Sequence, residues 1–365
     1  MIPELVPFYD AVKHPMETGN KPVIGYLCSY APEEIIHAAG YHPMRLFSSK
    51  PDIQLAENHL QAYCCSLVRG ILEDALAGNF KDLEGMVFPH TCDSIQRLSD
   101  IWRMNLKPAF FADLVMPAKL NTKASETYVE KVLERLVSDL EAHGGKKISQ
   151  ADLAESIGLF NGIRGRLSTL YTLYAQDPGI ISGKDLFTII KASMTMEREK
   201  LDLCLEKLLS QLKPMAPPKA PPKRLFLSGS VCDMPDLYTQ LERAGGHVVG
   251  DDLCSGQRYF QKRIPENLPP IKALTQGYTQ RLVCPAKHRG TTIRGEELVE
   301  RVRESQADGV IFTLLKFCDP HAFDYPYLKE FLDKAGIRHL HLEMDDNQDS
   351  QGQTATRLET FIQMI

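Results

Sequence analysis

Several common signatures are missing from this 365-residue sequence. No apolar run approaches the length of about 18 residues that marks a membrane-spanning helix, and the N-terminal stretch lacks the apolar core of a secretory signal. The formal net charge is -5, and no basic stripe is interleaved with aromatic side chains. Nucleic-acid binding is therefore not expected. These absences predict a cytoplasmic chain with no membrane and no nucleic-acid partner.

Two nucleotide-binding signatures are also missing. The glycine-rich GxGxxG turn of dinucleotide-binding folds does not occur, and "GGKKIS" at 144–149 lacks the form of a phosphate-binding loop. Since neither motif is present, the chain is not expected to bind ATP through a P-loop. Any step driven by ATP must then depend on a partner that hydrolyses it.

Cysteine is comparatively plentiful, with nine residues, but no CxxC pair occurs. The missing pairs argue against a zinc ribbon and a thioredoxin-type redox motif. Structural disulfides are rare in a reducing compartment, and an odd number of cysteines cannot pair completely. The thiols are therefore buried apolar side chains, a catalytic cysteine, or ligands of a metal site assembled from distant segments.

Short apolar segments alternate with helical patterns at both ends of the chain. Strands are expected in "KPVIGYLCSY", "EGMVFPHTCDS" and "KPAFFADLV", and later in "RLFLSGS", "HVVGDDLC" and "DGVIFTLLKFC". Several of the intervening helices have proline at the start or glycine at the end. This alternation is typical of an α/β fold, here with two Rossmann-like domains and parallel sheets.

A helical segment and a proline-rich stretch divide the chain. Apolar residues recur with helical spacing over 122–213. Residues 214–223 are proline-rich and are not expected to form a helix or a central strand. We therefore expect an N-terminal α/β domain over 1–213 that includes the helical segment, then this linker, and a C-terminal Rossmann-like domain over 224–365.

Five cysteines lie at, or just beyond, the C-terminal ends of predicted strands: Cys28, Cys92, Cys232, Cys254 and Cys318. In open parallel sheets this edge is where ligands bind. Cys92 and Cys318 also precede predicted helices, whose N-termini are expected to lower the thiol pKa and favour the metal-binding thiolate. Thiolates from both domains facing an interdomain cleft suit zinc or an iron–sulfur cluster. Scattered cysteines are more typical of iron–sulfur clusters than of structural zinc.

The segments "GYLCSYAPEEIIHAAGYHPMRLF", "QAYCCSLVRGILEDAL", "VFPHTCDSIQRL", "LSGSVCDMPDL", "DDLCSGQRYF" and "GVIFTLLKFCDPHAFDYPYLK" resemble the 2-hydroxyacyl-CoA dehydratase and benzoyl-CoA reductase family. The resemblance implies two Rossmann-like domains with a 4Fe–4S cubane cluster in the cleft between them. It also implies low-potential electrons from a separate ATP-hydrolysing iron–sulfur activator. By motif, the three shared ligands would be Cys65, Cys92 and Cys318.

Three further cysteines indicate a subgroup of that family, the double-cubane cluster proteins, in which a sulfide bridges two cubanes held by six cysteines. Cys28, Cys254 and Cys284 would supply the other three ligands, with Cys232 as the rival for the sixth place. The resemblance then implies a homodimeric, ATP-dependent reductase of a small molecule in an anaerobic cytoplasm.

Two alternatives remain open at this point. One is a subunit of a 2-hydroxyacyl-CoA dehydratase, which removes water from an acyl-CoA by radical chemistry, or of a benzoyl-CoA reductase. These enzymes work as paralogous heterodimers. The other is a scaffold that carries zinc or a cluster and never turns over.

Three histidines flank the predicted ligands: His90, His288 and His321. They are candidate proton donors for a reduction, because imidazole titrates near neutrality, although hydrogen bonding to a loop explains them equally well. Cys64 and Cys204 are interpreted as structural, since Cys64 would point away from its neighbour and Cys204 lies on an apolar helix face.

Four charged side chains near the cysteines have two interpretations each. Arg69 and Arg258 are candidate hydrogen-bond donors to cluster sulfides, but ordinary surface or salt-bridge roles are the simpler expectation. Glu33 and Glu34 follow Cys28 in the sequence, and their simplest role is at the start of a helix.

Overall fold

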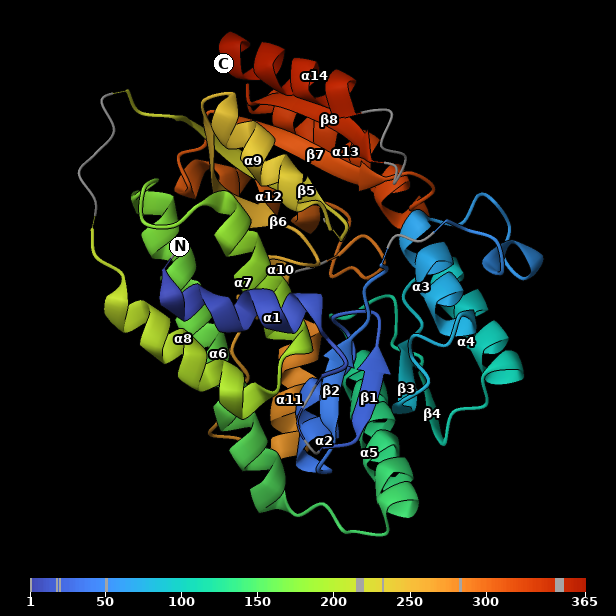
Figure 1. Cartoon of the computed structure of the whole chain (residues 1–365). Coiled ribbons are helices and arrows are strands. Elements are labelled where there is room, and N and C mark those ends of the chain that lie inside the picture. The colour runs from blue at the N-terminus through green and yellow to red at the C-terminus, as the bar shows by residue number, and fades with distance from the viewer. Residues whose placement is uncertain are drawn as a thin grey trace.

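Two four-stranded parallel sheets organise the computed structural model (Figure 1), which describes residues 2–17, 19, 21–49, 52–214, 220–231, 233–281, 284–344 and 351–365. The strands are β1 (Val23–Tyr26), β2 (His42–Arg45), β3 (Leu83–Pro89), β4 (Phe110–Leu114), β5 (Lys223–Gly229), β6 (Gly246–Asp252), β7 (Gly309–Leu315) and β8 (Arg338–Met344). Every strand pair is parallel. The predicted α/β fold with two Rossmann-like sheets is confirmed.

Helices connect the strands and cover both faces of each sheet. They are α1 (Val6–Lys13), α2 (Glu33–Ala38), α3 (Ser66–Leu76), α4 (Asp93–Asn105), α5 (Lys123–Gly144), α6 (Gln150–Gln176), α7 (Gly183–Thr195), α8 (Arg198–Gln211), α9 (Pro235–Arg243), α10 (Gln257–Phe260), α11 (Pro270–Gln280), α12 (Ile293–Glu304), α13 (Asp319–Lys334) and α14 (Gln351–Met364), with short 3-10 turns at Pro3–Leu5 and Ala56–Asn58. The predicted helical segment is confirmed as α5 to α8. Within the described ranges, no helix has the length and apolar character needed to cross a membrane.

Both sheets have the same topology, with the strand order β2-β1-β3-β4 in the first and β6-β5-β7-β8 in the second. In each sheet the chain changes direction after its second strand, so the switch points lie between β1 and β3 and between β5 and β7. Loops leave the carboxyl ends of these strand pairs in opposite directions and open a crevice there. The topology therefore marks one candidate ligand position on each sheet.

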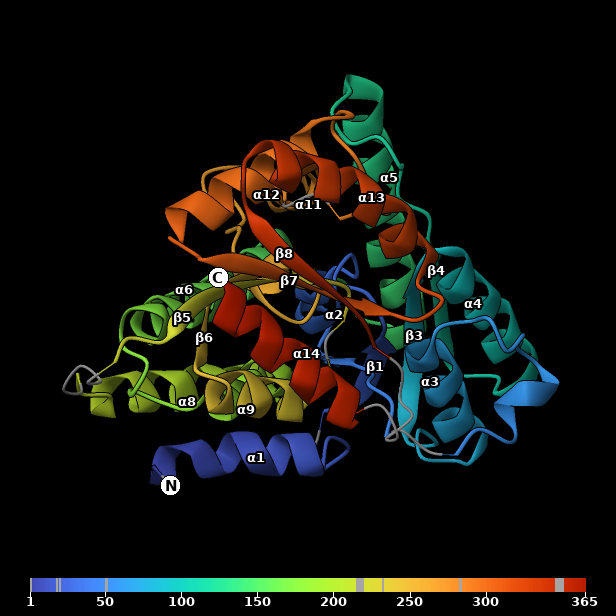
Figure 2. The same ribbon diagram turned by 90° about the horizontal axis from the view of Figure 1, so that it is seen from above.

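Alternating side chains bury each strand on two faces, as expected for parallel sheets covered by helices. In the first sheet, Ile24 and Val87 join a core with α2 and α5, whereas Met86 and Phe88 join another with α3 and α4. In the second sheet, α12 and α13 lie on one face and α9 and α14 on the other (Figure 2). This double burial explains the continuous apolar runs of the strands.

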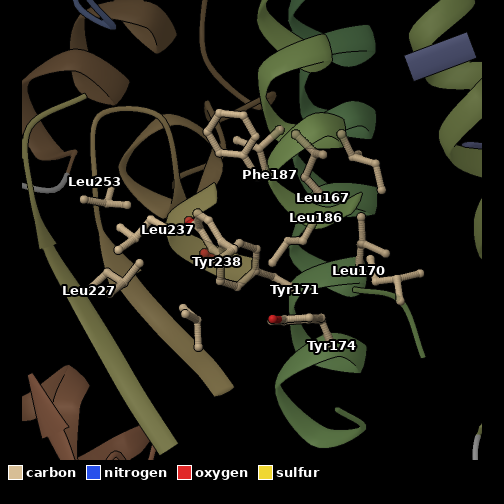
Figure 3. Packing of buried hydrophobic residues seen from close by; sticks show 14 of the residues in the cluster. Leu167, Leu170, Tyr171, Tyr174, Leu186, Phe187, Leu227, Leu237, Tyr238 and Leu253 are labelled. Atoms are coloured by element: carbon tan, nitrogen blue, oxygen red, sulfur yellow. The ribbon is translucent and has the colours of Figure 1, made fainter. Parts of the chain in front are cut away.

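The two sheets exchange helices. Leu167, Leu170 and Tyr171 of α6 pack towards Leu227 of β5 in the second sheet (Figure 3). In return, α11 packs against α5 and places Tyr278 in the core of the first sheet. Both cores thus contain residues from before and after the predicted linker 214–223. Residues 215–219 of this linker lie outside the described part of the chain.

A buried histidine on β2 predicts a pH-dependent stability. His42 Nε2 donates to the Thr195 carbonyl at 2.9 Å, and burial together with the charge of Arg198 lowers the pKa of His42 to about 3. In the unfolded chain His42 binds a proton below its ordinary pKa of about 6.5, whereas in the folded chain it stays neutral until the pH approaches 3. The free energy of unfolding should therefore fall as the pH drops from about 6.5 towards 3, by roughly 2 kcal/mol between about pH 7 and pH 5 from this group.

Urea unfolding at several pH values tests this expectation. His42→Gln keeps a hydrogen-bond donor and cannot titrate, so its stability should vary less with pH than that of the wild type. Equal slopes for the two proteins would remove His42 as the cause.

Candidate functional site

Six cysteines from both sheets form one connected group. Cys28 follows β1, Cys92 follows β3, Cys254 follows β6 and Cys318 follows β7, as the strand pattern predicts. Neighbouring cysteines affect one another's titration: Cys318 and Cys28 help to raise the pKa of Cys92, and Cys65 and Cys254 help to raise that of Cys318. Cys284 joins the group through Cys28 and Cys254. Six thiols that are remote in sequence therefore lie within electrostatic reach of their neighbours.

The group divides into two trios. Cys65, Cys92 and Cys318 each occupy the N-cap position of a helix, namely of α3, α4 and α13. We call them the helix-cap trio. Cys28 and Cys254 both act on Cys284, all three lie on loops, and we call them the loop trio. The pairs Cys92–Cys28 and Cys318–Cys254 connect the two.

The lowered pKa predicted for the thiols of Cys92 and Cys318 is wrong for the metal-free chain. Burial raises the pKa of Cys92 and of Cys318 to about 12. The backbone N–H groups of Ile95 and His321, in the first turns of α4 and α13, lower the pKa of Cys92 and Cys318 respectively, but by less than burial raises it. Burial also raises the pKa of Cys284. These thiols keep their protons until a cation replaces them, as thiolate ligation of a metal requires.

The spacing and the donor type together constrain the metal. All eight cysteines that the structure describes are free thiols, and no three His, Cys, Asp or Glu side chains among the described residues are close enough to hold one metal ion. A tetrahedral zinc ion with Zn–S bonds of about 2.3 Å needs its sulfurs about 4 Å apart. An iron–sulfur cluster distributes its cysteines over several iron atoms and accepts wider spacing. The described residues thus assemble no single-ion site, and a thiolate donor set is of the type that an iron–sulfur cluster would use.

Arg258 connects the loop trio to a buried charge network. Its Nη1 donates to Cys254 Sγ at 3.1 Å, while its Nε donates to Asp252 Oδ1 at 3.0 Å. Although burial opposes it, Arg258, Arg294 and Arg301 lower the pKa of Asp252. The salt-bridge interpretation of Arg258 is confirmed by its pairing with Asp252, and donation to a cluster sulfide stays a prediction. Arg69 pairs with the exposed Glu57 at 3.3 Å, an ordinary surface role.

The three candidate histidines have different surroundings. His90 Nε2 lies 2.8 Å from Asp113 Oδ1. His321 is buried, and burial together with Arg258 lowers its pKa well below the usual value, so it is neutral. His288 is exposed, and its backbone N–H donates to the Ala118 carbonyl. Proton donation by any of the three stays a prediction.

Glu33 and Glu34 do more than begin a helix. Both lie in the first turn of α2, yet both are buried. Glu33 Oε1 accepts from Arg198 Nη2 at 2.5 Å, and Glu34 pairs with Arg164. Their partners lie on α8 and α6, more than 120 residues away, and no local sequence signal connects them. The acids therefore fix the helical segment to the loop that follows Cys28.

A cavity of about 660 Å³ lies between α1, α7 and the end of β2. Phe47, Phe80 and Phe187 give it a largely apolar wall, and Lys191 pairs there with Asp233 at 2.6 Å. Ser48 and Asp233 also line a smaller void beside Ser66 and Leu315. Ser66 follows Cys65 in sequence, and the Leu315 carbonyl accepts from the Cys318 N–H at 3.0 Å. The cavity is therefore the candidate substrate space.

The remaining cysteines lie elsewhere. Cys64 is buried in the core under α3, and Cys204 packs on α8 against the helical core. Both placements agree with structural roles. Cys232, the rival ligand, lies outside the described residues.

Comparison with known proteins identifies the family to which this chain belongs. The family model described as 2-hydroxyglutaryl-CoA dehydratase, D-component, matches residues 28–365. The chain is 28% identical to the (R)-phenyllactyl-CoA dehydratase beta subunit of Clostridium sporogenes, over 97% of this chain and 94% of that protein. It is 25% identical to a benzoyl-CoA reductase subunit of Thauera aromatica, over 95% and 91%. It is 26% identical to the (R)-2-hydroxyglutaryl-CoA dehydratase beta subunit of Acidaminococcus fermentans, over 95% and 93%.

Proposed function

We propose the following function for this chain, which belongs to the family of the 2-hydroxyglutaryl-CoA dehydratase D-component. It holds an iron–sulfur double cubane in the cleft between its sheets and reduces a small molecule there. An ATP-hydrolysing iron–sulfur activator supplies the low-potential electrons, and two copies of the chain form a homodimer.

One observation supports the proposal: six cysteines from remote segments lie within electrostatic reach of one another in one connected series, three of them at helix N-caps and three on loops. The helix-cap trio contains the three cysteines that match the family motifs. The loop trio supplies three further thiols, as a second cubane needs. Three thiolates per cubane would leave one iron of each cubane open for another ligand.

The surrounding residues have separable tasks in this function. When bound, the cluster supplies low-potential electrons. Arg258 donates an N–H to the Cys254 sulfur, and hydrogen bonds to cluster sulfurs influence the reduction potential. Phe47, Phe80 and Phe187 give the substrate a largely apolar wall. His90, whose Nε2 lies 2.8 Å from Asp113 Oδ1, would supply a proton.

The second candidate function is a subunit of a 2-hydroxyacyl-CoA dehydratase or a benzoyl-CoA reductase. The names of the relatives favour it, because they are subunits of enzymes named for phenyllactyl-CoA, 2-hydroxyglutaryl-CoA and benzoyl-CoA. In that case the helix-cap trio would hold a single cluster, and a paralogous subunit would complete the enzyme.

Iron and acid-labile sulfide analysis after anaerobic purification separates these functions. The double cubane predicts about eight irons per chain, and the dehydratase subunit predicts about four. Size-exclusion chromatography with light scattering on the same sample distinguishes a homodimer from a chain that awaits a second subunit. Zinc without sulfide would contradict both functions and identify a scaffold.

A further inference from the structure

We propose that Arg45 and Arg281 are positioning residues that hold the loops of Cys28 and Cys254 together before any cluster binds. They would preform the cradle of the loop trio. The inference rests on the proposed function, because it assigns these arginines a role at the same site.

Arg45 joins the two loops on one side. It is buried on β2, where its Nε donates to the Leu27 carbonyl at 3.1 Å and its Nη1 donates to the Cys254 carbonyl at 2.8 Å. Leu27 directly precedes Cys28. One guanidinium therefore connects the backbone before Cys28 with the backbone of Cys254, across the two sheets.

Arg281 makes a related connection, between the residue after Cys28 and the short helix α10 that follows Cys254. Its Nη1 donates to the carbonyl of Ser29, which follows Cys28, and its Nη2 donates to the Arg258 carbonyl at 2.9 Å. The guanidinium lies 4.9 Å from the centre of the Tyr30 ring and 5.6 Å from that of Tyr278. Contacts with two aromatic rings fix its orientation.

The Cys284 loop is attached to the first sheet by similar means. Lys287, whose N–H donates to the Cys284 carbonyl at 3.0 Å, reaches the Met116 carbonyl with its Nζ at 2.7 Å. The next residue, His288, donates its backbone N–H to the Ala118 carbonyl at 2.8 Å. All three loops of the trio are thus connected to the opposite half of the chain by hydrogen bonds that need no metal.

Arginine is suited to this role for a physical reason. Buried carbonyl groups need donors, and a planar guanidinium offers several N–H groups in a fixed fork that can serve two carbonyls at once. A lysine ammonium is a compact point charge without that geometry. The helix-cap trio depends on the first turns of α3, α4 and α13 instead, so the arginines should affect the loop trio selectively.

Iron and sulfide content of the full-length variants tests the proposal. We expect the double variant Arg45→Met, Arg281→Met to hold about four irons per chain where the wild type holds about eight. The iron content of Arg45→Lys should lie between those of the wild type and the double variant. Arg166→Met removes a partly buried arginine that pairs with Asp202 at 2.8 Å between α6 and α8, far from these loops, and should retain the wild-type iron content.

A second measurement uses the metal-free chain, so that it does not depend on cluster assembly. Alkylation with iodoacetamide, followed by peptide mass spectrometry, gives the reaction rate of each cysteine. In the double variant the rates of Cys28 and Cys254 should rise roughly fivefold or more, because local opening exposes them, while that of Cys92 stays unchanged. Circular dichroism checks that the helical content is retained.

The outcomes separate this proposal from the proposed function. Wild-type iron content and unchanged alkylation rates in the double variant would overturn the role of the arginines. A uniform rise at all cysteines would also overturn it, since that indicates general unfolding. A wild type with fewer than about eight irons contradicts the double cubane, and the alkylation rates then still decide whether the arginines hold the loops.

Discussion

Replacing Cys65 by serine should remove about four irons per chain and nearly all reductase activity. Cys65 is the N-cap of α3 and interacts with Cys318, so its loss leaves the helix-cap trio with two thiols. Serine is a poor ligand for iron in a thiolate site because its oxygen is hard and weakly acidic. Iron analysis and activity with a chemical or protein electron donor measure both effects.

The neighbouring cysteine supplies a matched control. Cys64 is as buried as Cys65, with 6% and 7% of their surfaces exposed, and belongs to the same core, but its Sγ donates to Gln61 Oε1 at 3.9 Å, whereas Cys65 interacts with Cys318. Cys64→Ser should therefore retain the wild-type iron content and most of the activity. Equal iron in the two variants would exclude Cys65 from the site, and the loss of iron in both would point to damage of α3.

Replacing Arg198 by methionine should lower the free energy of unfolding by about 3–5 kcal/mol, as is typical when one partner of a buried ion pair is removed. The Arg198 side chain is fully buried and donates to Glu33 Oε1 at 2.5 Å and to the Pro43 carbonyl at 2.8 Å. Its removal leaves Glu33 as an uncompensated buried charge. Urea unfolding of the metal-free chain measures the loss without interference from a cluster.

Two further variants test the cause. Arg198→Met combined with Glu33→Gln removes both charges and should recover part of the lost stability, because Tyr26 can still donate to residue 33. Arg166→Met breaks a more exposed pair and should lower the free energy of unfolding by about 1 kcal/mol or less. If the double variant is no more stable than the single one, the unpaired carboxylate is not the cause.

Local sequence patterns were sufficient to predict most of the fold and part of the site. Alternating strands and helices predict the two parallel sheets, and chain topology then places the residues after β1, β3, β6 and β7 at ligand-binding edges. Cys28, Cys92, Cys254 and Cys318 follow from this reasoning. Cys65 follows only from its motif, although its N-cap position gives a physical reason for it.

The remainder of the site depends on tertiary packing. Cys284 reaches the loop trio because α11 crosses to the first sheet, and nothing in the local sequence specifies that crossing. The partners of Glu33 and Glu34 are equally remote. The thiol pKa values were predicted in the wrong direction, because the burial that outweighs the helix termini arises only when both sheets meet.

The exchange of helices between the sheets has a consequence for how the protein is made. Tyr278 and Cys284 complete the core around the first sheet, so that core cannot close while the ribosome has delivered only the first 213 residues. Cys28, Cys65 and Cys92 are therefore synthesised before the cysteines of the second half that lie near them in the folded chain. On the proposed function, insertion of the cluster would therefore follow synthesis of the second half of the chain, which supplies Cys254, Cys284 and Cys318.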